Sequence, residues 1–275
     1  MSDTESAALR GQGLDLAYHG DVVVHGASVE IHQGRVTALV GPNGSGKSTL
    51  LRALARLHTP SAGSVELDDA PDALALSRRD FARRVTLLAQ SRPTPTGISV
   101  RDVVGFGRHP YRGRWRAADP EGVAAVTHAM RVTGVEELAD RSADELSGGQ
   151  LQRVWVATCL AQQTGVLLLD EPTTHLDLRY QVELLDLVRD LADEHRVAVG
   201  LVLHDLDQAA AVADVLALLD RGRVRAVGAP DEVLTAERLS ETYGIRVEVD
   251  MDPVTGTLRT RAVGRHATRS AVIGN

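Results

Sequence analysis

The chain has 275 residues, a length that suits one large domain or one domain with an inserted lobe. Hydrophobic residues make up 43% and charged residues 24%, a globular composition that excludes disorder along the whole chain. The formal net charge of −7 and the low aromatic content of 3% argue against nucleic acid as a partner.

Cysteine usage and apolar runs exclude further classes of protein. Cys159 is the single cysteine, which excludes an intramolecular disulfide and a multi-cysteine zinc site. The acidic N-terminus lacks the basic and apolar regions of a secretion signal. No apolar run approaches the roughly 18 to 20 residues that span a bilayer. We therefore expect a cytoplasmic protein that is held at a membrane only through a partner.

The first part of the chain predicts a half-buried sheet followed by a phosphate-binding unit. Apolar residues alternate with polar or small ones at 14–18 and 29–31, which predicts antiparallel strands. An apolar run at 35–40 enters a glycine-rich turn, and residues 48–57 then have helical spacing. This order of strand, loop and helix is typical of phosphate-binding folds. Further strands are expected at residues 64–67, 85–89, 166–169, 197–203 and 215–219.

The middle and the end of the chain have a different character. Residues 91–116 contain prolines and glycines that interrupt regular structure, and the pattern at 119–164 is mainly helical. We therefore expect a helical lobe, roughly 91–164, inserted into an α/β frame. The tail at 245–263 alternates like a small hairpin. A helix after residue 169 is predicted by the apolar face Leu184, Leu187, Val188 and Leu191.

The glycine-rich loop carries a strong chemical signal. Of the 30 basic residues only Lys47 is a lysine, and it lies in a loop of the P-loop pattern G-x-x-x-x-G-K-[ST]. Glycines let backbone N–H groups surround a phosphate, Lys47 can bridge the β- and γ-phosphates, and the Ser48 hydroxyl can bind Mg²⁺. The candidate ATP-binding residues are Gly41, Pro42, Asn43, Gly44, Ser45, Gly46, Lys47, Ser48 and Thr49.

Two carboxylates follow the apolar strand at 166–169. Asp170 and Glu171 come at its carboxyl end, where ligands bind in open parallel sheets. Asp170 can hold Mg²⁺ directly or through water. Glu171 can orient or deprotonate the water that attacks the γ-phosphate. Together with the P-loop, this pair predicts a site for nucleotide hydrolysis.

A second anion-binding segment is predicted at 146–150. Ser147 can cap the helix that follows, Gly148 and Gly149 leave its N-terminal amides uncovered, and Gln150 completes the segment. A single nucleotide does not need two helix N-termini from distant points of one chain. We therefore expect a second copy of the chain to present this segment in trans.

With these motifs in this order, residues 12–245 resemble the nucleotide-binding subunit of an ATP-binding cassette (ABC) transporter, and residues 146–150 match the signature motif of that family. The resemblance implies further site residues. Tyr18 falls where the family stacks an aromatic ring on adenine, and Gln90 matches the glutamine that contacts magnesium and the attacking water. His204 matches the histidine that contacts the γ-phosphate.

The loop after Glu171 also matches the family. Asp177 falls in the loop that crosses the dimer interface, although Thr174-His175 precedes it where many relatives have Ser-Ala. The implied catalytic residues are Glu171, His204, Gln90 and Lys47. The implied magnesium ligands are Ser48, Gln90 and Asp170.

A narrower resemblance points to importers of iron(III)-siderophores, with haem and cobalamin importers as close relatives. It is carried by residues 102–104, 107–110 and 173–177 together with Gln181. The segment 91–116 lies where such subunits dock on the permease. The basic and aromatic residues that suit this contact surface are Arg101, Arg108, Tyr111, Arg112, Arg114, Trp115 and Arg116.

The sequence therefore predicts an α/β P-loop NTPase core of the ABC type with an N-terminal antiparallel β subdomain and an inserted helical subdomain. The ATPase domain is expected at 1–245, and a C-terminal extension with a hairpin and a flexible end at 246–275. The expected cofactors are ATP and Mg²⁺. The expected partners are membrane permease subunits, a second copy in a head-to-tail dimer and, indirectly, a periplasmic or lipid-anchored substrate-binding protein.

The predicted function is ATP hydrolysis that energises uptake of an iron(III)-siderophore or related metal chelate from the cytoplasmic face of the membrane. Haem import, cobalamin import and an exporter are alternative transport roles. A DNA-repair or translation-factor ABC protein is a rival, opposed by the lack of a coiled-coil insertion or second cassette. A P-loop kinase is another rival, but residues 146–150 and His204 have no role in it.

Overall fold

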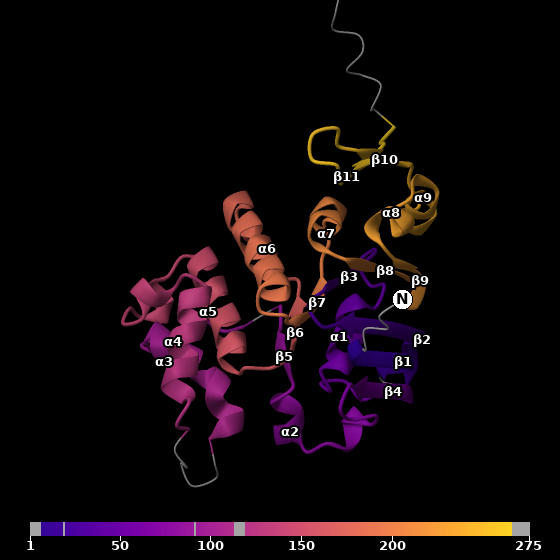
Figure 1. Ribbon diagram of the computed structural model, residues 1–275. Helices are drawn as coiled ribbons and strands as arrows, with labels where there is room; N and C mark the ends of the chain where they lie inside the picture. Colours follow the sequence, from indigo (N-terminus) through magenta and orange to yellow (C-terminus); the bar gives the residue numbers. More distant parts are fainter. Residues whose placement is uncertain (1–6, 19, 91, 113–118, 266–275) are drawn as a thin grey trace, which may run out of the picture.

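The computed structural model describes residues 7–18, 20–90, 92–112 and 119–265 (Figure 1). Its centre is a six-stranded sheet in the order β5-β6-β7-β3-β8-β9. All neighbouring strands in it are parallel except β8 and β9. Strands predicted for this sheet are confirmed within one or two residues at their ends. The strands are β3 (Val36–Val40), β5 (Val85–Leu88), β6 (Val166–Asp170), β7 (Ala198–Val202), β8 (Val215–Asp220) and β9 (Arg223–Gly228).

A three-stranded antiparallel sheet in the order β2-β1-β4 lies beside the central sheet. It contains β1 (Ala7–Tyr18), β2 (Asp21–His32) and β4 (Ala62–Leu67). The sequence predicted only short strands here, whereas β1 and β2 are each 12 residues long. Gly13 and Gly26, with φ of 57° and 56°, lie at irregularities in the register of the two strands. These bulges break the alternation on which the sequence prediction depends.

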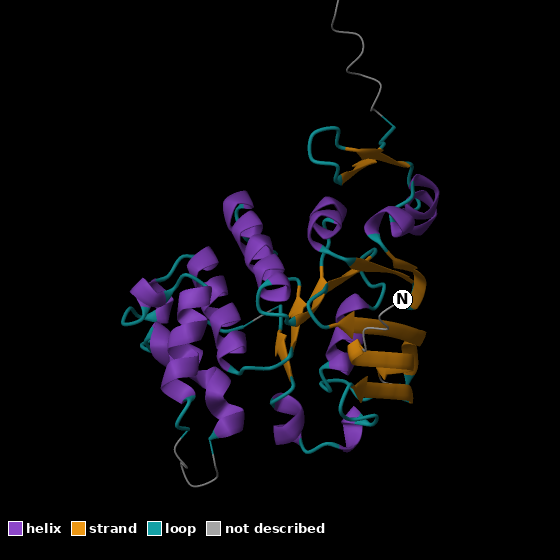
Figure 2. Ribbon diagram, in the orientation of Figure 1, coloured by secondary structure: helices purple, strands orange, loops and turns teal. Residues whose placement is uncertain are grey.

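Helices cover both faces of the central sheet (Figure 2). α1 (Lys47–Leu54) packs between the two sheets, and its leucines join the strands of both in one buried cluster. α6 (Leu178–Asp193) and α7 (Leu206–Val212) cover the opposite face. Shorter helices are α2 (Arg78–Ala82), α8 (Pro230–Val233) and α9 (Ala236–Tyr243).

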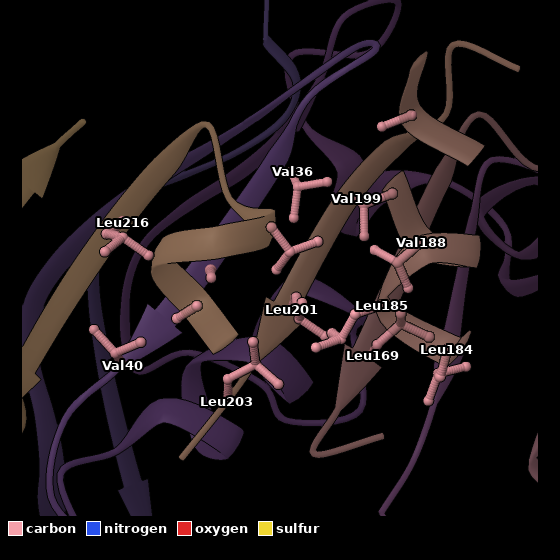
Figure 3. Packing of buried hydrophobic residues seen from close by; sticks show 14 of the residues in the cluster. Val36, Val40, Leu169, Leu184, Leu185, Val188, Val199, Leu201, Leu203 and Leu216 are labelled. Carbon is pink, nitrogen blue, oxygen red and sulfur yellow. The ribbon is translucent and has the colours of Figure 1, made fainter. Parts of the chain in front are cut away.

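The apolar face predicted for the helix after β6 is confirmed in α6. Figure 3 shows Leu184, Leu185 and Val188 packed toward Val199 and Leu201 of β7. These five side chains are at most 9% exposed. Burial of apolar area of this kind is the main stabilising contribution to such a core, at about 25 cal/mol per Å². This packing fixes the loop between β6 and α6 on the sheet.

The predicted helical lobe is present and has a core of its own. It contains α3 (Val100–Gly105), α4 (Gly122–Val132) and α5 (Gly148–Ala161), which lie together at one side of the sheet (Figure 1). Apolar residues such as Val103, Met130 and Val154 are fully buried between these helices. The connections contain the short 3₁₀ turns Phe106–Tyr111, Glu136–Leu138 and Ala143–Glu145.

The structure corrects the predicted basic contact surface at 91–116. Arg108 is only 1% exposed and forms an ion pair with Asp119 at 2.7 Å. Its guanidinium also lies 3.9 Å from the ring centroid of Tyr111, whose hydroxyl donates to the Gln162 carbonyl. Arg108 therefore holds the lobe together from inside and does not form an outer surface, whereas Tyr111 is partly exposed. Arg101 and Arg112 are exposed, whereas Arg114, Trp115 and Arg116 lie outside the described residues.

The predicted C-terminal hairpin is present as β10 (Val247–Met251) and β11 (Leu258–Ala262). Val247 belongs to the buried cluster of the central sheet, and Val249 and Leu258 pack against that cluster. The chain beyond residue 265 lies outside the described residues. Within the described part of the chain, the helices are too short or too polar to cross a membrane.

Candidate nucleotide-binding site

The predicted P-loop joins β3 to α1 and has the geometry that its glycines permit. Gly41 has a φ of 138°, and a Cβ at this position would lie 2.0 Å from the Leu219 carbonyl oxygen. Gly46 has a φ of 100° and precedes α1 without a side-chain cap. The first amides of α1 are therefore available to an anion, which a helix N-terminus favours through its dipole. Each of these glycines is required by backbone geometry.

The side chain of Lys47 is buried against the carbonyl groups of its own loop. It is 4% exposed, and its Nζ donates to the carbonyl oxygens of Gly41 at 2.8 Å and Pro42 at 2.9 Å. Burial lowers the pKa of Lys47, while the negative charges of Glu171 and Asp170 oppose that shift. The ammonium group thus lies at the glycine loop among neutral acceptors, where a phosphate can take their place.

Asp170 ends β6 as a buried carboxylate. Its side chain has no exposed area, and its Oδ2 lies 3.2 Å from Nη2 of Arg52 on α1. Its Oδ1 is buried without a hydrogen-bond partner among the described residues, and so is Oγ of Ser45 in the P-loop. An unpartnered buried carboxylate oxygen is costly unless a donor or cation completes it. The donor set therefore fits Mg²⁺, which prefers oxygen ligands.

Glu171 brings together predicted residues from three parts of the chain. Its Oε1 lies 2.6 Å from Nε2 of His204, which follows β7. Its Oε2 accepts a hydrogen bond from Nε2 of Gln90, which follows β5. Thr174 also donates to Oε2, at 3.4 Å. Because β5, β6 and β7 are parallel neighbours, their carboxyl ends place these side chains at one edge of the sheet.

The backbone and the surroundings of Glu171 are unusual. Its φ of 52° is in the left-handed region, which costs free energy in a residue with a side chain. A hollow of about 180 Å³ is lined by Glu171, Thr174, His204 and Gln208. A space of this size holds several water molecules. The carboxylate can thus orient water beside the P-loop edge of the sheet.

Gln90 and Tyr18 are the two other positions that the resemblance implied. Gln90 was predicted to end a strand at 85–89, but β5 ends at Leu88 and Gln90 is exposed in the loop that follows. Tyr18 ends β1, is 41% exposed and lies 4.5 Å from His58 between ring centroids. An exposed aromatic ring is therefore present where the resemblance requires one. The sequence prediction did not include His58.

The segment at 146–150 forms the N-terminus of α5. Ser147 is the N-cap, its Oγ accepts from the Gln150 amide at 3.3 Å, and the Gln150 side chain accepts from the Ser147 amide. Ser147 therefore caps this helix as predicted. A Cβ at Gly149 would lie 2.4 Å from the Tyr180 ring, whereas nothing lies within 4 Å of one at Gly148.

The structure does not bring this segment to the P-loop of the same chain. Among the described residues, no hydrogen bond or ion pair joins residues 147–150 to residues 41–49 or to Glu171. In Figure 1, strands β5 and β6 separate α5 from α1. Asp177 is exposed at the N-cap of α6 and makes no side-chain capping bond. This arrangement leaves both the segment and Asp177 accessible to a second molecule.

Arg52 and Thr174 are site residues that sequence reasoning missed. The signal for Arg52 was its place on α1, five residues after Lys47, on the helix that faces the strand ends. The signal for Thr174 was its place three residues after Glu171, which allows a turn to bring the two side chains together. Neither position identifies a site residue from the sequence alone, because the order of the strands decides which side chains meet.

A parallel sheet with a glycine loop and helix N-terminus at its carboxyl edge defines an α/β P-loop protein. The sequence profile of the family described as ABC transporter matches residues 24–174, and the chain belongs to this family. It is thus an ATP-binding ABC ATPase.

Curated relatives match almost the whole chain. The ferric enterobactin transport ATP-binding protein FepC of Escherichia coli (strain K12) is 47% identical over 98% of this chain and 99% of its own length. The probable siderophore transport system ATP-binding protein YusV of Bacillus subtilis (strain 168) is 39% identical over 91% of each chain. A cobalamin import ATP-binding protein of Halobacterium salinarum is 44% identical over 90% of this chain and 61% of its own length.

A solved structure shares the fold over a similar extent. The structure described as an inward-facing conformation of a metal-chelate type ABC transporter has a TM-score of 0.82 and 26% identity. It covers 94% of this chain and 98% of the matched chain. The ABC ATPase fold with its antiparallel sheet and helical lobe, predicted from the sequence, is thus confirmed.

Proposed function

We propose that this chain is the ATP-hydrolysing subunit of an importer for an iron(III)-siderophore or a related metal chelate. The observation that carries the proposal is its 47% identity, over nearly the full length of both chains, to a ferric enterobactin transport ATP-binding protein. The likeness to a metal-chelate type transporter supports the same class of cargo. The cargo itself is bound by other subunits, so this chain contributes the work of ATP hydrolysis.

In this proposal the P-loop binds the phosphates of ATP. The backbone amides of residues 43–49 and the ammonium of Lys47 surround the β- and γ-phosphates. Ser48, Gln90 and Asp170 would hold Mg²⁺, and the free Oδ1 of Asp170 supports this role. The metal, when bound, offsets charge that develops on the phosphate oxygens. Tyr18, exposed at the end of β1, stacks on the adenine ring.

Glu171 orients the attacking water and accepts its proton. Its two oxygens contact His204 and Gln90, which fixes the carboxylate at the edge of the sheet. His204 then contacts the γ-phosphate, and Lys47 offsets the negative charge of the transition state. Proton transfer by a positioned side chain contributes roughly 10²- to 10⁴-fold to a rate. The reaction is an in-line displacement at the γ-phosphate by water.

The second half of each site comes from another copy of the chain. In a head-to-tail dimer, Ser147, Gly148, Gly149 and Gln150 of one copy bind the γ-phosphate held by the other, with Asp177 at the interface. The separation of this segment from the P-loop of its own chain supports the model. Closure is favourable only when ATP joins the two copies, and hydrolysis reopens the dimer.

The proposed dimer works at a membrane, and each chain contains an ATPase domain and a C-terminal extension. The dimer binds membrane permease subunits at the cytoplasmic face of the membrane and works indirectly with a periplasmic or lipid-anchored substrate-binding protein. Residues 1–245 form the ATPase domain with the helical lobe at about 91–164, and residues 246–275 form the C-terminal extension. The separate buried core of the helical lobe supports its assignment as a subdomain.

Uptake of labelled cargo tests the proposed function. Cells that lack this chain should lose uptake of iron(III)-siderophore, and the wild-type chain should restore it. The matched control Glu171→Gln should not restore uptake, although it should still associate with the permease. Normal iron uptake in cells without the chain would contradict the proposal.

Cobalamin import is a second candidate, favoured by the 44% identity to a cobalamin import ATP-binding protein. The same cells should then lose uptake of labelled cobalamin while they keep uptake of iron. The two assays, run side by side, decide between these cargoes.

A further inference from the structure

His204 is positioned by the first turn of α7. The chain leaves β7 at Val202 and α7 begins at Leu206, so His204 lies in a short connection between them. Asp205 caps α7, because its Oδ1 accepts from the amides of Asp207 at 2.9 Å and Gln208 at 3.0 Å. A rotation of this turn therefore moves the imidazole that lies 2.6 Å from Glu171.

The C-terminal hairpin holds this turn from the outside. Oδ1 of Asp207 accepts from the backbone amide of Thr260 at 2.7 Å and from its hydroxyl at 2.8 Å. Thr260 lies on β11, which runs over α7 in Figure 1. A carboxylate in the first turn of a helix is also favoured by the helix dipole. Two donors on one oxygen restrict both the distance and the direction of the contact.

The hairpin is itself fixed to the body of the protein. Val247 is 6% exposed in the buried cluster that contains the central sheet and α6, and Leu258 packs against the same cluster. The Val247 amide donates to Oγ of Ser240 on α9 at 2.9 Å. Thr260 is thus a fixed point against which the start of α7 is held.

The inner side of the same turn reaches the loop that carries Glu171. Nε2 of Gln208 donates to Oε1 of Gln181 on α6 at 2.8 Å. Nε2 of Gln181 donates in turn to the Leu176 carbonyl at 2.9 Å. The first turn of α7 therefore links the hairpin to His204 and, through Gln181, to the loop at 171–177.

We propose that Asp207 and Thr260 are positioning residues for ATP hydrolysis, through which the C-terminal hairpin fixes His204 against Glu171. The inference rests on the proposed function, because it takes Glu171 and His204 as the hydrolytic groups. Neither Asp207 nor Thr260 belongs to the proposed nucleotide site. Their contact decides how well the imidazole is held when ATP is bound.

The size of the effect follows from what remains when the contact is lost. A misplacement of roughly 1 Å at a catalytic group can cost about 100-fold in rate. Asp205 and Gln208 still hold the turn, so we expect a smaller loss of roughly threefold to tenfold in kcat. The KM for ATP should stay unchanged, because the P-loop is not involved.

The test compares variants of the purified full-length chain in ATP hydrolysis and thermal unfolding. Asp207→Ala and Thr260→Val should each lower kcat with the KM for ATP unchanged. Thr260→Ser keeps the hydroxyl donor and should retain the wild-type kcat. Thr260→Val removes only the hydroxyl bond and keeps the amide bond, so its loss should be smaller than that of Asp207→Ala. The combination of the two should be no slower than Asp207→Ala alone, because Asp207→Ala already removes both bonds. Asp250→Ala, at an exposed carboxylate of β10, is the control.

Three results overturn the inference. A wild-type kcat in both Asp207→Ala and Thr260→Val, even with a lower unfolding temperature, would make the contact purely structural. An equal loss in Thr260→Ser or Asp250→Ala would show that the effect does not come from this contact. A wild-type chain that neither binds nor hydrolyses ATP would refute the proposed function itself. If Asp207→Ala does not fold, the comparison of Thr260→Val with Thr260→Ser decides.

Discussion

The buried ion pair between Arg108 and Asp119 should contribute measurably to the stability of the helical lobe. Arg108 is 1% exposed and Asp119 is 10% exposed at the side chain, and the two groups are joined by two hydrogen bonds of 2.7 and 2.9 Å. Asp119→Ala removes the carboxylate and leaves the guanidinium charge inside the lobe. Its remaining partners are the Ala161 carbonyl at 2.9 Å, Gln163 and the ring of Tyr111.

The expected loss of stability depends on how well the remaining partners compensate the charge of Arg108. A buried charge that loses its partner typically destabilises a protein by about 3 to 5 kcal/mol. The acceptors that remain around Arg108 reduce this, so we expect Asp119→Ala to lower the free energy of unfolding by about 2 to 3 kcal/mol. Replacement of both members by apolar residues, Arg108→Met with Asp119→Leu, should recover most of that loss.

Urea denaturation at pH 7, followed by circular dichroism, measures these differences. The matched control is Asp140→Ala, because its pair with Arg101 spans 3.5 Å and is exposed at 91% and 49%. That variant should change the free energy of unfolding by less than about 1 kcal/mol. Equal stabilities of Asp119→Ala and Asp140→Ala would mean that burial adds nothing to the Arg108–Asp119 pair, and a double variant less stable than Asp119→Ala would mean that the cost does not come from an unpaired charge.

The same pair predicts a pH dependence. The hydrogen bonds and the charge of Arg108 hold the pKa of Asp119 below its usual value. A carboxyl whose folded pKa is lowered stabilises the protein above its unfolded pKa, and this contribution is lost as the pH falls through the folded pKa. The stability difference between wild type and Asp119→Asn should therefore be constant near neutral pH and shrink below about pH 4.

Other predictions concern the nucleotide site. Gly149→Ala should lower the free energy of unfolding by about 1 to 2 kcal/mol in urea, because its Cβ meets the Tyr180 ring, whereas Gly148→Ala should not. Equal stability of the two would contradict the packing. Ser147→Ala should cost about 1 kcal/mol through loss of the α5 cap, and an unchanged urea midpoint would contradict that role. Lys47→Ala should weaken ATP binding in calorimetry by roughly tenfold or more; wild-type affinity would mean that the loop is misassigned.

Local patterns predicted the parts of the fold that depend on local physics. The buried strands β3, β6 and β7 are continuous apolar runs because both faces of a parallel sheet are covered. The glycine pattern before Lys47 predicted a loop whose φ angles at Gly41 and Gly46 only glycine adopts readily. Ser147 was predicted to cap the helix that follows, and the structure shows this cap together with a return bond from the Gln150 side chain.

Contacts between segments far apart in the sequence could not be predicted from local sequence patterns. Arg108 was predicted at a contact surface because its segment resembles the one that docks on a permease, and only the fold shows that Asp119 and Gln163 surround it. The pairing of Arg52 with Asp170 spans 118 residues and depends on the sheet order. The contact between Asp207 and Thr260 likewise follows from where the hairpin packs.

In the proposed mechanism Glu171, held by His204 and Gln90, activates water for hydrolysis at the P-loop. Single-turnover ATP hydrolysis with the wild-type chain and Glu171→Gln, together with ATP binding by both, measures this role. The substitution keeps the size of the side chain and removes its charge. We predict a rate lower by roughly 10²- to 10⁴-fold with ATP binding retained. A hydrolysis rate within about twofold of wild type would contradict the role of Glu171 as the general base, because a general base contributes far more than that.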